Sequence, residues 1–328
     1  MKRRRIMDSV LTWVASSLTL GTIILFGALG EILTEKSGHL NLGVPGMMFF
    51  GAFAGFAAVL KYELNNPIKS DFALVVIPLV VGFLAAAALG LLYSFFTVTL
   101  KANQNVTGLA ITALGVGMGS FYGQRVLQAA NMGFGRTAAT LIFNQSLFGP
   151  SFDVGFMVIV GIIVAIILQL FLSKTKKGLN LRAVGENPAT ADAAGINVTL
   201  NKYLATCIGG GISGIGGALY VCNLGWSTNN NIEALGWLAV ALVIFATWKP
   251  VNAIWGSYLF ALFYNFYNYF SSIFHVTLAS DIKTAVGDLL QMIPYVVTII
   301  ILILIAYRKK RENQPPASLG LNYFREDR

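Results

Sequence analysis

Nine uncharged, strongly apolar stretches dominate this sequence and constrain its fold more than any single motif. They are Ser9 to Gly30, Leu40 to Leu60, Phe72 to Leu100, Ala102 to Gln124, Val154 to Ser173, Tyr203 to Ile232, Ala234 to Trp248, Pro250 to Phe274 and Leu289 to Tyr307. A helix that crosses the hydrocarbon core of a bilayer needs about 20 apolar residues, because no water is present there to satisfy backbone groups. The chain has 56% hydrophobic and only 11% charged residues, far from the composition of soluble domains. The sequence therefore predicts an all-α, polytopic membrane protein with about 9–10 transmembrane helices, some of them broken or re-entrant.

The net charge of +9 comes mostly from three basic blocks that flank apolar stretches, which is typical of topology signals rather than of nucleic-acid binding. The blocks are Lys2 to Arg5, Lys174 to Arg182 with Lys202, and Arg308 to Arg311 with the tail. Because Lys and Arg near span ends favour the cytoplasm, we expect both termini inside the cell. The expected organisation is a cytoplasmic N-terminus at 1–8, a transmembrane domain at 9–307 with a cytoplasmic loop at 173–202, and a cytoplasmic tail at 308–328.

The number of crossings before the middle basic block bears on this topology. Five apolar stretches lie between Arg5 and Lys174, whereas a cytoplasmic position of both requires an even number. We therefore expect one more crossing or a re-entrant segment, supplied by Thr137 to Phe152 or by a break near Gly38. The basic start resembles a signal peptide, but its apolar run is long enough to span, and we interpret it as the first helix. The tail after Tyr307 is polar and proline-containing, so we expect it to be poorly ordered.

Catalytic and metal-binding patterns are not found in the sequence. There is no Gly-Lys-Ser nucleotide loop, no Ser-His-Asp arrangement and no cluster of carboxylates, so we expect no enzymatic activity and no cofactor in this chain. The two cysteines, Cys207 and Cys222, lie within one apolar stretch and are expected to pack in the interior. His39 and His275 stand alone, which predicts no metal site. The glycine-rich run from Gly209 to Gly217 predicts close helix packing.

The first polar interruption lies between the first two apolar stretches, from Glu31 to Gly46. Its glycines and its proline break helical hydrogen bonding, which membrane proteins tolerate where the freed groups face protein or a water-filled cavity. One interpretation is a broken helix beside a solute path, with Asn41 facing that path. The other is a solvated interfacial loop in which Glu35 and Lys36 face lipid headgroups.

The second interruption, from Lys101 to Gly108, places three amides and a hydroxyl between two apolar stretches. Amides offer donors and acceptors without charge, and can therefore pair with a neutral ligand such as a nucleobase or sugar. Amides also bond one helix to another, and this alternative stays open. The residues predicted to line the substrate pathway are Asn41, Asn103, Gln104, Asn105 and Thr107.

The third polar segment, from Gly178 to Val198, carries the pattern of a short capped helix. Asn187 before Pro188 suits a helix N-terminus, and Gly195 can close the helix in a left-handed conformation. We expect a two-turn cytoplasmic helix whose small alanine face enters a groove of a partner protein. The alternative is a helix that only lies at the membrane interface.

Four segments together resemble a known family. They are Glu35 to Met48 (EKSGHLNLGVPGMM), Ala102 to Ala110 (ANQNVTGLA), Leu181 to Asn197 (LRAVGENPATADAAGIN) and Leu238 to Pro250 (LAVALVIFATWKP). They resemble the ATP-binding cassette importer permeases for branched-chain amino acids, ribose and nucleosides, and come nearest to the nucleoside and simple-sugar branch. The resemblance runs from about Leu20 to Leu262. It implies a permease subunit of a bacterial plasma-membrane importer that moves nucleosides by alternating access.

The resemblance also implies partners. These are a second, homologous permease, a cytoplasmic ATPase that binds the ATP, and an extracytoplasmic substrate-binding lipoprotein. It further implies a coupling helix that docks on the ATPase and that is formed by Glu186, Asn187, Pro188, Ala191, Asp192 and Gly195.

The sequence departs from the family pattern at three positions and leaves other functions open. Many relatives carry an acidic residue in place of Pro45, and aliphatic residues in place of His39 and Asn105. A ribose-like sugar and riboflavin therefore remain alternative substrates. A passive channel is less favoured because it needs no docking helix, and a membrane enzyme because it needs clustered acids or histidines.

Overall fold

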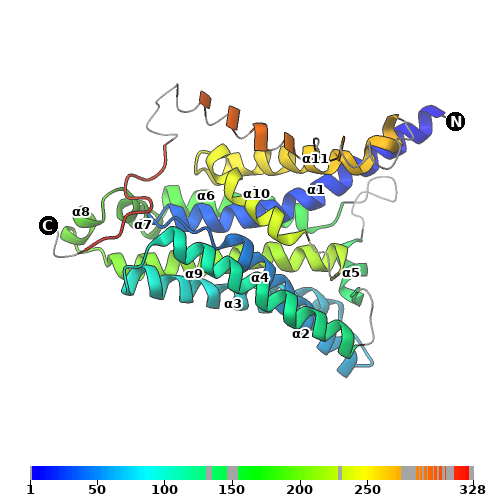
Figure 1. Ribbon diagram of the computed structural model, residues 1–328, viewed down its shortest axis with the longest axis horizontal. Helices are drawn as coiled ribbons and strands as arrows, with labels where there is room; N and C mark the ends of the chain where they lie inside the picture. Colours follow the sequence, from blue (N-terminus) through cyan, green and yellow to red (C-terminus); the bar gives the residue numbers. More distant parts are fainter. Residues whose placement is uncertain are drawn as a thin grey trace.

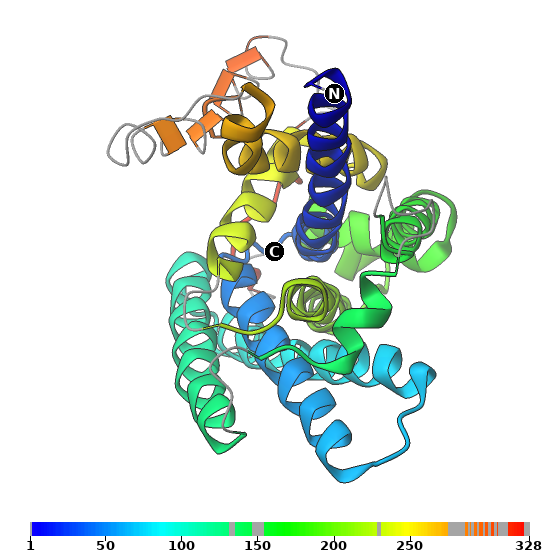
Figure 2. The ribbon, with the colours of Figure 1, turned by 90° about the vertical axis from the view of Figure 1, so that its right-hand side faces the viewer.

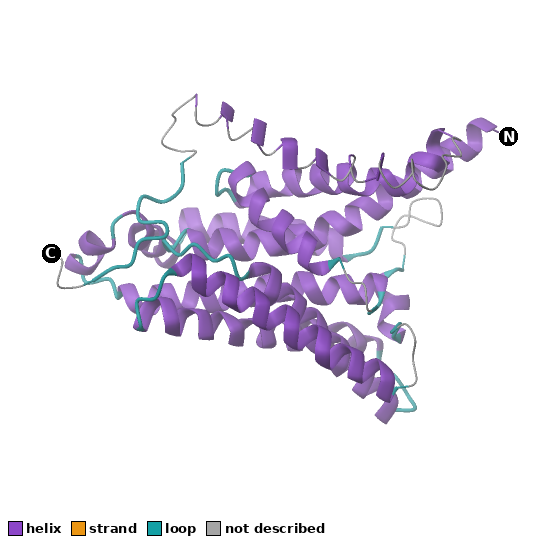
Figure 3. Cartoon of the chain, viewed as in Figure 1, coloured by secondary structure: helices purple, strands orange, loops and turns teal. Residues whose placement is uncertain are grey.

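A computed structural model describes residues 2–130, 135–145, 154–227, 231–274 and 314–324, with separate short pieces between 286 and 307. Every described element is a helix, apart from an isolated antiparallel bridge between Gly135 and Trp226 (Figure 3). The predicted all-α fold is confirmed.

The helices follow the apolar stretches closely. They are α1 (Lys2–Glu35), α2 (Val44–Asn65), α3 (Asp71–Ser94) with a π-helical continuation (Phe95–Thr99), α4 (Gln104–Ala129), α5 (Ala138–Phe143), α6 (Met157–Lys174), α7 (Lys176–Glu186), α8 (Pro188–Ala193), α9 (Val198–Leu224), α10 (Ile232–Phe245) and α11 (Pro250–Phe274). Within the described ranges, six helices are long and apolar enough to span a membrane, namely α1, α2, α3, α4, α6 and α9. The apolar stretch at 289–307 is described only in separate short pieces, so the total number of spans stays a prediction.

The long helices lie side by side along the longest axis of the molecule (Figure 1). One end of this bundle carries α7, α8 and the segment 314–324, and is called the α8 end. The opposite end carries α5 and the N-terminus, and is called the α5 end. The two ends are structurally distinct, and each holds a different candidate site.

The placement of the N-terminus differs from the topology expected from the basic blocks. Five spans (α1, α2, α3, α4 and α6) precede α7, and α5 has only six residues. The described part of the region proposed as a sixth crossing therefore holds only a short helix, and its remainder, 146–152, lies outside the described residues. The turn at 36–43 simply reverses the chain between α1 and α2. Helix α1 crosses the bundle once without a break. The N-terminus therefore lies at the end opposite the segment 314–324 (Figure 1).

Helix α9 occupies the middle of the bundle and packs against α1, α2 and α3 (Figure 2). Its glycines allow backbones to touch: a Cβ on Gly217 would collide with the carbonyl oxygen of Met48, and one on Gly209 with the carbonyl oxygen of Gly30. The prediction that the glycine run serves close packing is confirmed. Both cysteines are free, Cys222 buried and Cys207 half-buried.

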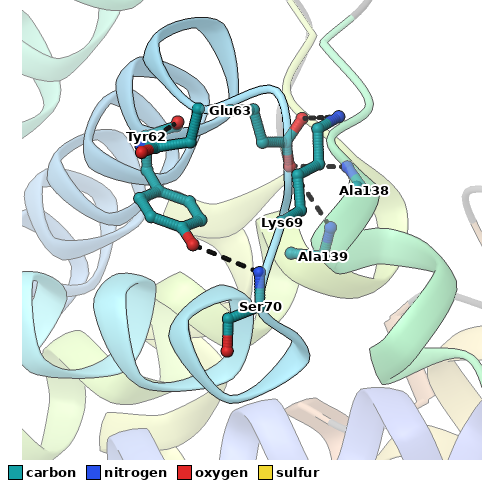
Figure 4. A network of polar contacts seen from close by, with 7 residues as sticks. Tyr62, Glu63, Lys69, Ser70, Ala138 and Ala139 are labelled. Atoms are coloured by element: carbon teal, nitrogen blue, oxygen red, sulfur yellow. Dashed lines mark hydrogen bonds and ion pairs between the residues drawn. The ribbon is translucent and has the colours of Figure 1, made fainter.

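A small polar network ties the α5 end together (Figure 4). The carboxylate of Glu63 on α2 accepts hydrogen bonds from the backbone N–H groups of Ala138 (2.6 Å) and Ala139 (3.4 Å), at the start of α5. The ammonium of Lys69 lies 3.8 Å from the other oxygen of Glu63. A carboxylate is favourable at a helix N-terminus, where unpaired N–H groups point outward. Glu63 therefore fixes α5 to the α2–α3 hairpin.

Candidate substrate cavity and coupling face

A cavity of about 770 Å³ opens at the α5 end between α1, α9, α10 and α11. Side chains that can form hydrogen bonds dominate its wall. They are Thr12, Ser16, Thr19, Arg136, Asn144, Tyr220, Asn223, Asn231, Tyr264, Asn265, Asn268 and Tyr269. Such a concentration inside otherwise apolar helices is a signature of a substrate or ion pathway.

Helical spacing explains why these side chains meet. Thr12, Ser16 and Thr19 follow one another at four and three residues along α1, and so share one face of that helix. On α11, Asn265 and Asn268 are three residues apart and project from one side. Because polar groups cannot face lipid at low cost, a position on the cavity wall is favourable for both stripes.

Hydrogen bonds across the cavity wall join α11 to α1. The Nδ2 group of Asn265 donates to the hydroxyls of Ser16 (2.8 Å) and Ser17 (3.3 Å). The Nδ2 group of Asn268 donates to Oδ1 of Asn265 (2.8 Å). An amide carries two donor hydrogens and an acceptor oxygen, so Asn268 keeps capacity to bond a ligand.

The remaining wall is organised around the end of α9. The Nδ2 group of Asn144 donates to the carbonyl of Asn223 (3.0 Å), and the hydroxyl of Tyr220 accepts from the backbone N–H of Asn231 (3.4 Å). Tyrosine offers an apolar ring face with a polar tip, and amides offer donors and acceptors without charge. Among the described residues no carboxylate lines the cavity, and the one charged side chain in its wall is that of Arg136. This chemistry suits a neutral, ring-containing polar solute rather than a cation.

Asn41 lies at the α8 end and away from this cavity. It is fully buried, and its Oδ1 accepts from the backbone N–H of Gly43 (2.9 Å). Its own backbone N–H donates to the buried carboxylate of Glu31 (3.0 Å). Asn41 therefore shapes the turn at 36–43, and a contact with solute stays a prediction.

The turn at 36–43 is not a solvated loop. Glu35 is 2% exposed and accepts a hydrogen bond from the indole of Trp248. His39 is 1% exposed, and burial together with the nearby charges of Lys202 and Lys101 holds its pKa well below the usual value. The imidazole is therefore neutral at physiological pH. Of the two interpretations of this segment, the one with Glu35 facing headgroups is wrong.

The second predicted group lies beside this turn, at the start of α4. Asn103 caps α4 by accepting from the backbone N–H groups of Asn105 (3.0 Å) and Val106 (3.1 Å). The side chain of Gln104 is buried and accepts from the N–H of Leu40 (2.9 Å). The hydroxyl of Thr107 donates back to the carbonyl of Asn103 (2.8 Å). These polar groups serve helix capping and segment contacts here, and their predicted role in the pathway is untested.

The segment predicted as a coupling helix forms α8. The side chain of Asn187 accepts from the backbone N–H of Thr190 (3.0 Å), and Gly195 follows the helix in the left-handed conformation with φ +80°. Ala191 is 3% exposed and packs with Val184 and Val198, which fixes α8 to α7 and α9. The exposed surface consists of Glu186, Asn187, Thr190, Ala193, Ala194 and Gly195. Its small side chains would let a partner approach the backbone closely.

The described part of the tail, 314–324, packs against the α8 end, contrary to the expected poor order. The backbone N–H of Ser318 donates to the carbonyl of Gly185 (3.0 Å), and that of Gly320 to the carbonyl of Gly38 (3.2 Å). The Nδ2 group of Asn322 donates to the carbonyl of Lys101 (2.7 Å). The tail is thus held mainly by hydrogen bonds to backbone carbonyls of the α8 end, which composition alone does not reveal.

Two further contacts bring the tail to the predicted site residues. The hydroxyl of Tyr323 donates to the carboxylate of Asp192 in α8 (3.0 Å). The Nε2 group of Gln104 donates to the carbonyl of Leu321 (3.3 Å). The tail thus joins the α8 segment, the start of α4 and the turn at 36–43.

Sequence reasoning missed the substrate cavity, although a signal was present. Asn223, Asn265 and Asn268 stand inside apolar stretches that also carry several tyrosines. Intramembrane polar residues are expensive in lipid, and their recurrence in the last stretches marks a lined cavity. The prediction used polar interruptions between stretches and overlooked these positions within them.

Comparison with known proteins is consistent with this architecture. Residues 13–306 match the family described as branched-chain amino acid transport system, permease component. The chain belongs to this permease family. It is a membrane-embedded transport component rather than an enzyme, as the sequence predicted.

Relatives of this permease align over most of its length. It is 30% identical to the nucleoside ABC transporter permease protein NupC of Lactococcus lactis, over 95% of this chain and 96% of the relative. It is 30% identical to the guanosine ABC transporter permease protein NupQ of Bacillus subtilis, over 88% of this chain and 90% of the relative. A putative glucose ABC transporter permease protein, TsgC13 of Haloferax volcanii, is 34% identical over 74% of this chain and 72% of the relative. No solved structure matches the permease.

Proposed function

We propose that this permease subunit imports nucleosides and that the cavity at the α5 end is part of their path. The observation that supports this most is the cavity wall of asparagines, tyrosines and hydroxyls, which suits a neutral base and sugar. Two relatives that align over nearly the whole chain are described as nucleoside and guanosine permeases. A nucleoside joins a flat aromatic base to a hydroxylated ring, and both halves find matching groups in this wall.

A simple sugar is the second candidate substrate. One relative is described as a putative glucose permease, and sugars also pair with amides and pack on aromatic rings. Competition between the two solute classes separates these candidates.

We further propose that the α8 end faces the cytoplasm and the α5 end faces outward. The α8 end carries many basic residues, namely Lys36, Lys101, Lys174, Lys176, Lys177, Arg182, Lys202 and Lys249. This distribution follows the positive-inside bias, although the Lys2 to Arg5 block then lies outside. Arg3→Cys and Thr190→Cys, each made in a chain that carries Cys207→Ala and Cys222→Ala, would test the orientation in intact cells. Labelling of Arg3→Cys alone by an impermeant thiol reagent is expected, and labelling of Thr190→Cys alone would reverse the orientation.

Partners follow from this orientation. A cytoplasmic ATPase would bind ATP and dock on α8 and the end of α7, at Glu186, Asn187 and Pro188. A second permease would complete the pore, in keeping with the similarity to both NupC and NupB of Lactococcus lactis, the latter 22% identical. A substrate-binding lipoprotein would deliver nucleoside at the α5 end. Closure of the ATPase would then move α8 and switch the pore between outward and inward access.

Uptake of labelled nucleosides by cells that lack and regain this chain tests the substrate. We expect restored uptake of purine or pyrimidine nucleosides that excess unlabelled nucleoside abolishes and that ribose and riboflavin leave intact. Restored entry of a sugar or riboflavin without nucleoside uptake would agree with the assignment as a permease but would refute the proposal that nucleosides are its substrates. Asn201→Ala, which changes an asparagine of α9 outside the cavity, serves as the expression-matched control.

A further inference from the structure

A second hollow, of about 460 Å³, lies at the α8 end and has a chemistry unlike that of the substrate cavity. Five parts of the chain form its wall: the turn after α1, the end of α6, α7, the α10–α11 turn, and the start of the segment 314–324. Three basic residues line it, namely Lys36, Arg182 and Lys249, together with one acidic residue, Glu186. The formal charge of the wall is therefore positive.

None of these three cations forms an ion pair within 4.0 Å with a carboxylate of the described residues, although Glu186 shares the wall with them. The single ion pair found among the described residues is that of Lys69 with Glu63, at the other end of the molecule. Lys36 is half-buried, and burial lowers its pKa most. The carboxylates of Glu186 and Glu35 oppose this lowering, whereas the charges of Arg182 and Lys249 add to it. Gathering like charges in a partly dry hollow is costly unless an anion neutralises them.

Unsatisfied polar atoms line the same hollow. The Nε–H group of Arg182 is buried without a hydrogen-bond acceptor, and Oε1 of Gln169 is buried without a donor. A buried donor or acceptor without a partner costs about 1–3 kcal/mol. A ligand that supplies both an anionic oxygen and a hydroxyl would satisfy both atoms.

From this arrangement we propose that the hollow binds the phosphoryl group of a phosphate ester. Guanidinium and ammonium groups are the usual partners of phosphoryl oxygens, and Arg182 presents a planar set of donors. Gln169 would accept from a hydroxyl of the same ester. The ester is either the headgroup of an anionic phospholipid in the adjacent leaflet or a soluble phosphate ester. Its binding holds α6, α7, the α10–α11 turn and the tail together next to the face proposed to dock on the ATPase.

The test uses the full-length chain in micelles of dodecyl maltoside, a detergent that carries no phosphate. Phosphatidylglycerol is then introduced in one series, and adenosine monophosphate or inorganic phosphate is titrated in another. Thermal unfolding and native mass spectrometry report stabilisation and bound ester. We expect one source to bind and to raise the unfolding temperature, and Arg182→Gln and Lys249→Gln each to weaken binding roughly tenfold.

The matched control is Lys176→Gln, which removes an exposed cation from the same helix α7 without touching the hollow. It should bind as the unaltered chain does. Binding of phosphatidylglycerol alone assigns a lipid site, and binding of adenosine monophosphate or phosphate alone assigns a soluble ligand. If neither source stabilises the chain, or if all three variants bind equally well, the proposal is wrong. Loss of ATPase association in Arg182→Gln, without any phosphoryl binding, would instead show that an acidic segment of the ATPase fills the hollow. Because these assays do not require transport, they are independent of the substrate assignment.

Discussion

The two ends of the bundle use the same amide side chains in opposite ways. At the α8 end, the side-chain amide of Gln104 hydrogen-bonds only to protein groups. It accepts from Leu40 and donates to Leu321 and Asn322. At the α5 end, Asn268 makes one hydrogen bond to Asn265 and borders a cavity. An amide with all its capacity used fixes structure, whereas one with spare capacity can recognise a solute. The difference indicates that this permease separates solute recognition from the machinery that moves it.

The largest expected effect concerns the saturated amide of the α8 end. Gln104→Met keeps the volume of the side chain but leaves the half-buried N–H of Leu40 without its acceptor and removes the bonds from α4 to the tail. We expect a loss of about 1–3 kcal/mol in the free energy of unfolding. Chemical denaturation of the purified chain in detergent measures it. An unchanged stability would show that the α8 end is less tightly bonded than its contacts indicate.

A smaller effect, visible in transport rather than stability, is expected at the α5 end. Asn268→Ala removes one amide from the cavity wall, and a neutral hydrogen bond contributes about 0.5–1.5 kcal/mol. Nucleoside affinity in uptake assays should fall roughly threefold to tenfold while the unfolding temperature stays near that of the unaltered chain. Asn201→Ala should change neither quantity. Equal losses of stability in Asn268→Ala and Gln104→Met would remove the contrast between the two ends.

The smallest effect is expected from the bond between the tail and α8. Tyr323→Phe deletes a hydroxyl that donates to Asp192 (3.0 Å) and preserves the ring. The bond lies in a half-buried position, so we expect a loss of about 1 kcal/mol or less. Hydrogen exchange should become faster in α8 and remain unchanged in α5, which Glu63 holds at the other end. Unchanged exchange in α8 would mean that Val184 and Val198 alone position this helix.

Features governed by neighbouring residues could be predicted from the sequence. The α8 helix was foreseen because an Asn-Pro start and a glycine end obey local capping rules, and the structure places Asn187 and Gly195 in those roles. The spans followed from apolar length in the same way.

Features that depend on distant partners could not be predicted. The cavity is assembled from α1, α9, α10 and α11, which are far apart in the sequence, so no single stretch announces it. The tail looked unstructured by composition, yet Ser318 bonds to the backbone of Gly185 across more than a hundred residues. The positive-inside rule predicted that the N-terminus lies on the same side as the middle basic block, which requires an even number of crossings between them. The described residues between them contain five spans, α1, α2, α3, α4 and α6.

Helix α9 gives the separation of the two ends a mechanical meaning. It begins three residues after Gly195 and runs without interruption for 27 residues, about 40 Å at the usual rise. Its last turn carries Tyr220 and Asn223 into the cavity wall. Its glycines bring its backbone against those of α1, α2 and α3. Because α9 is continuous, a displacement of its first turn would also displace its last turn. Helix α9 can therefore couple the docking face mechanically to the cavity.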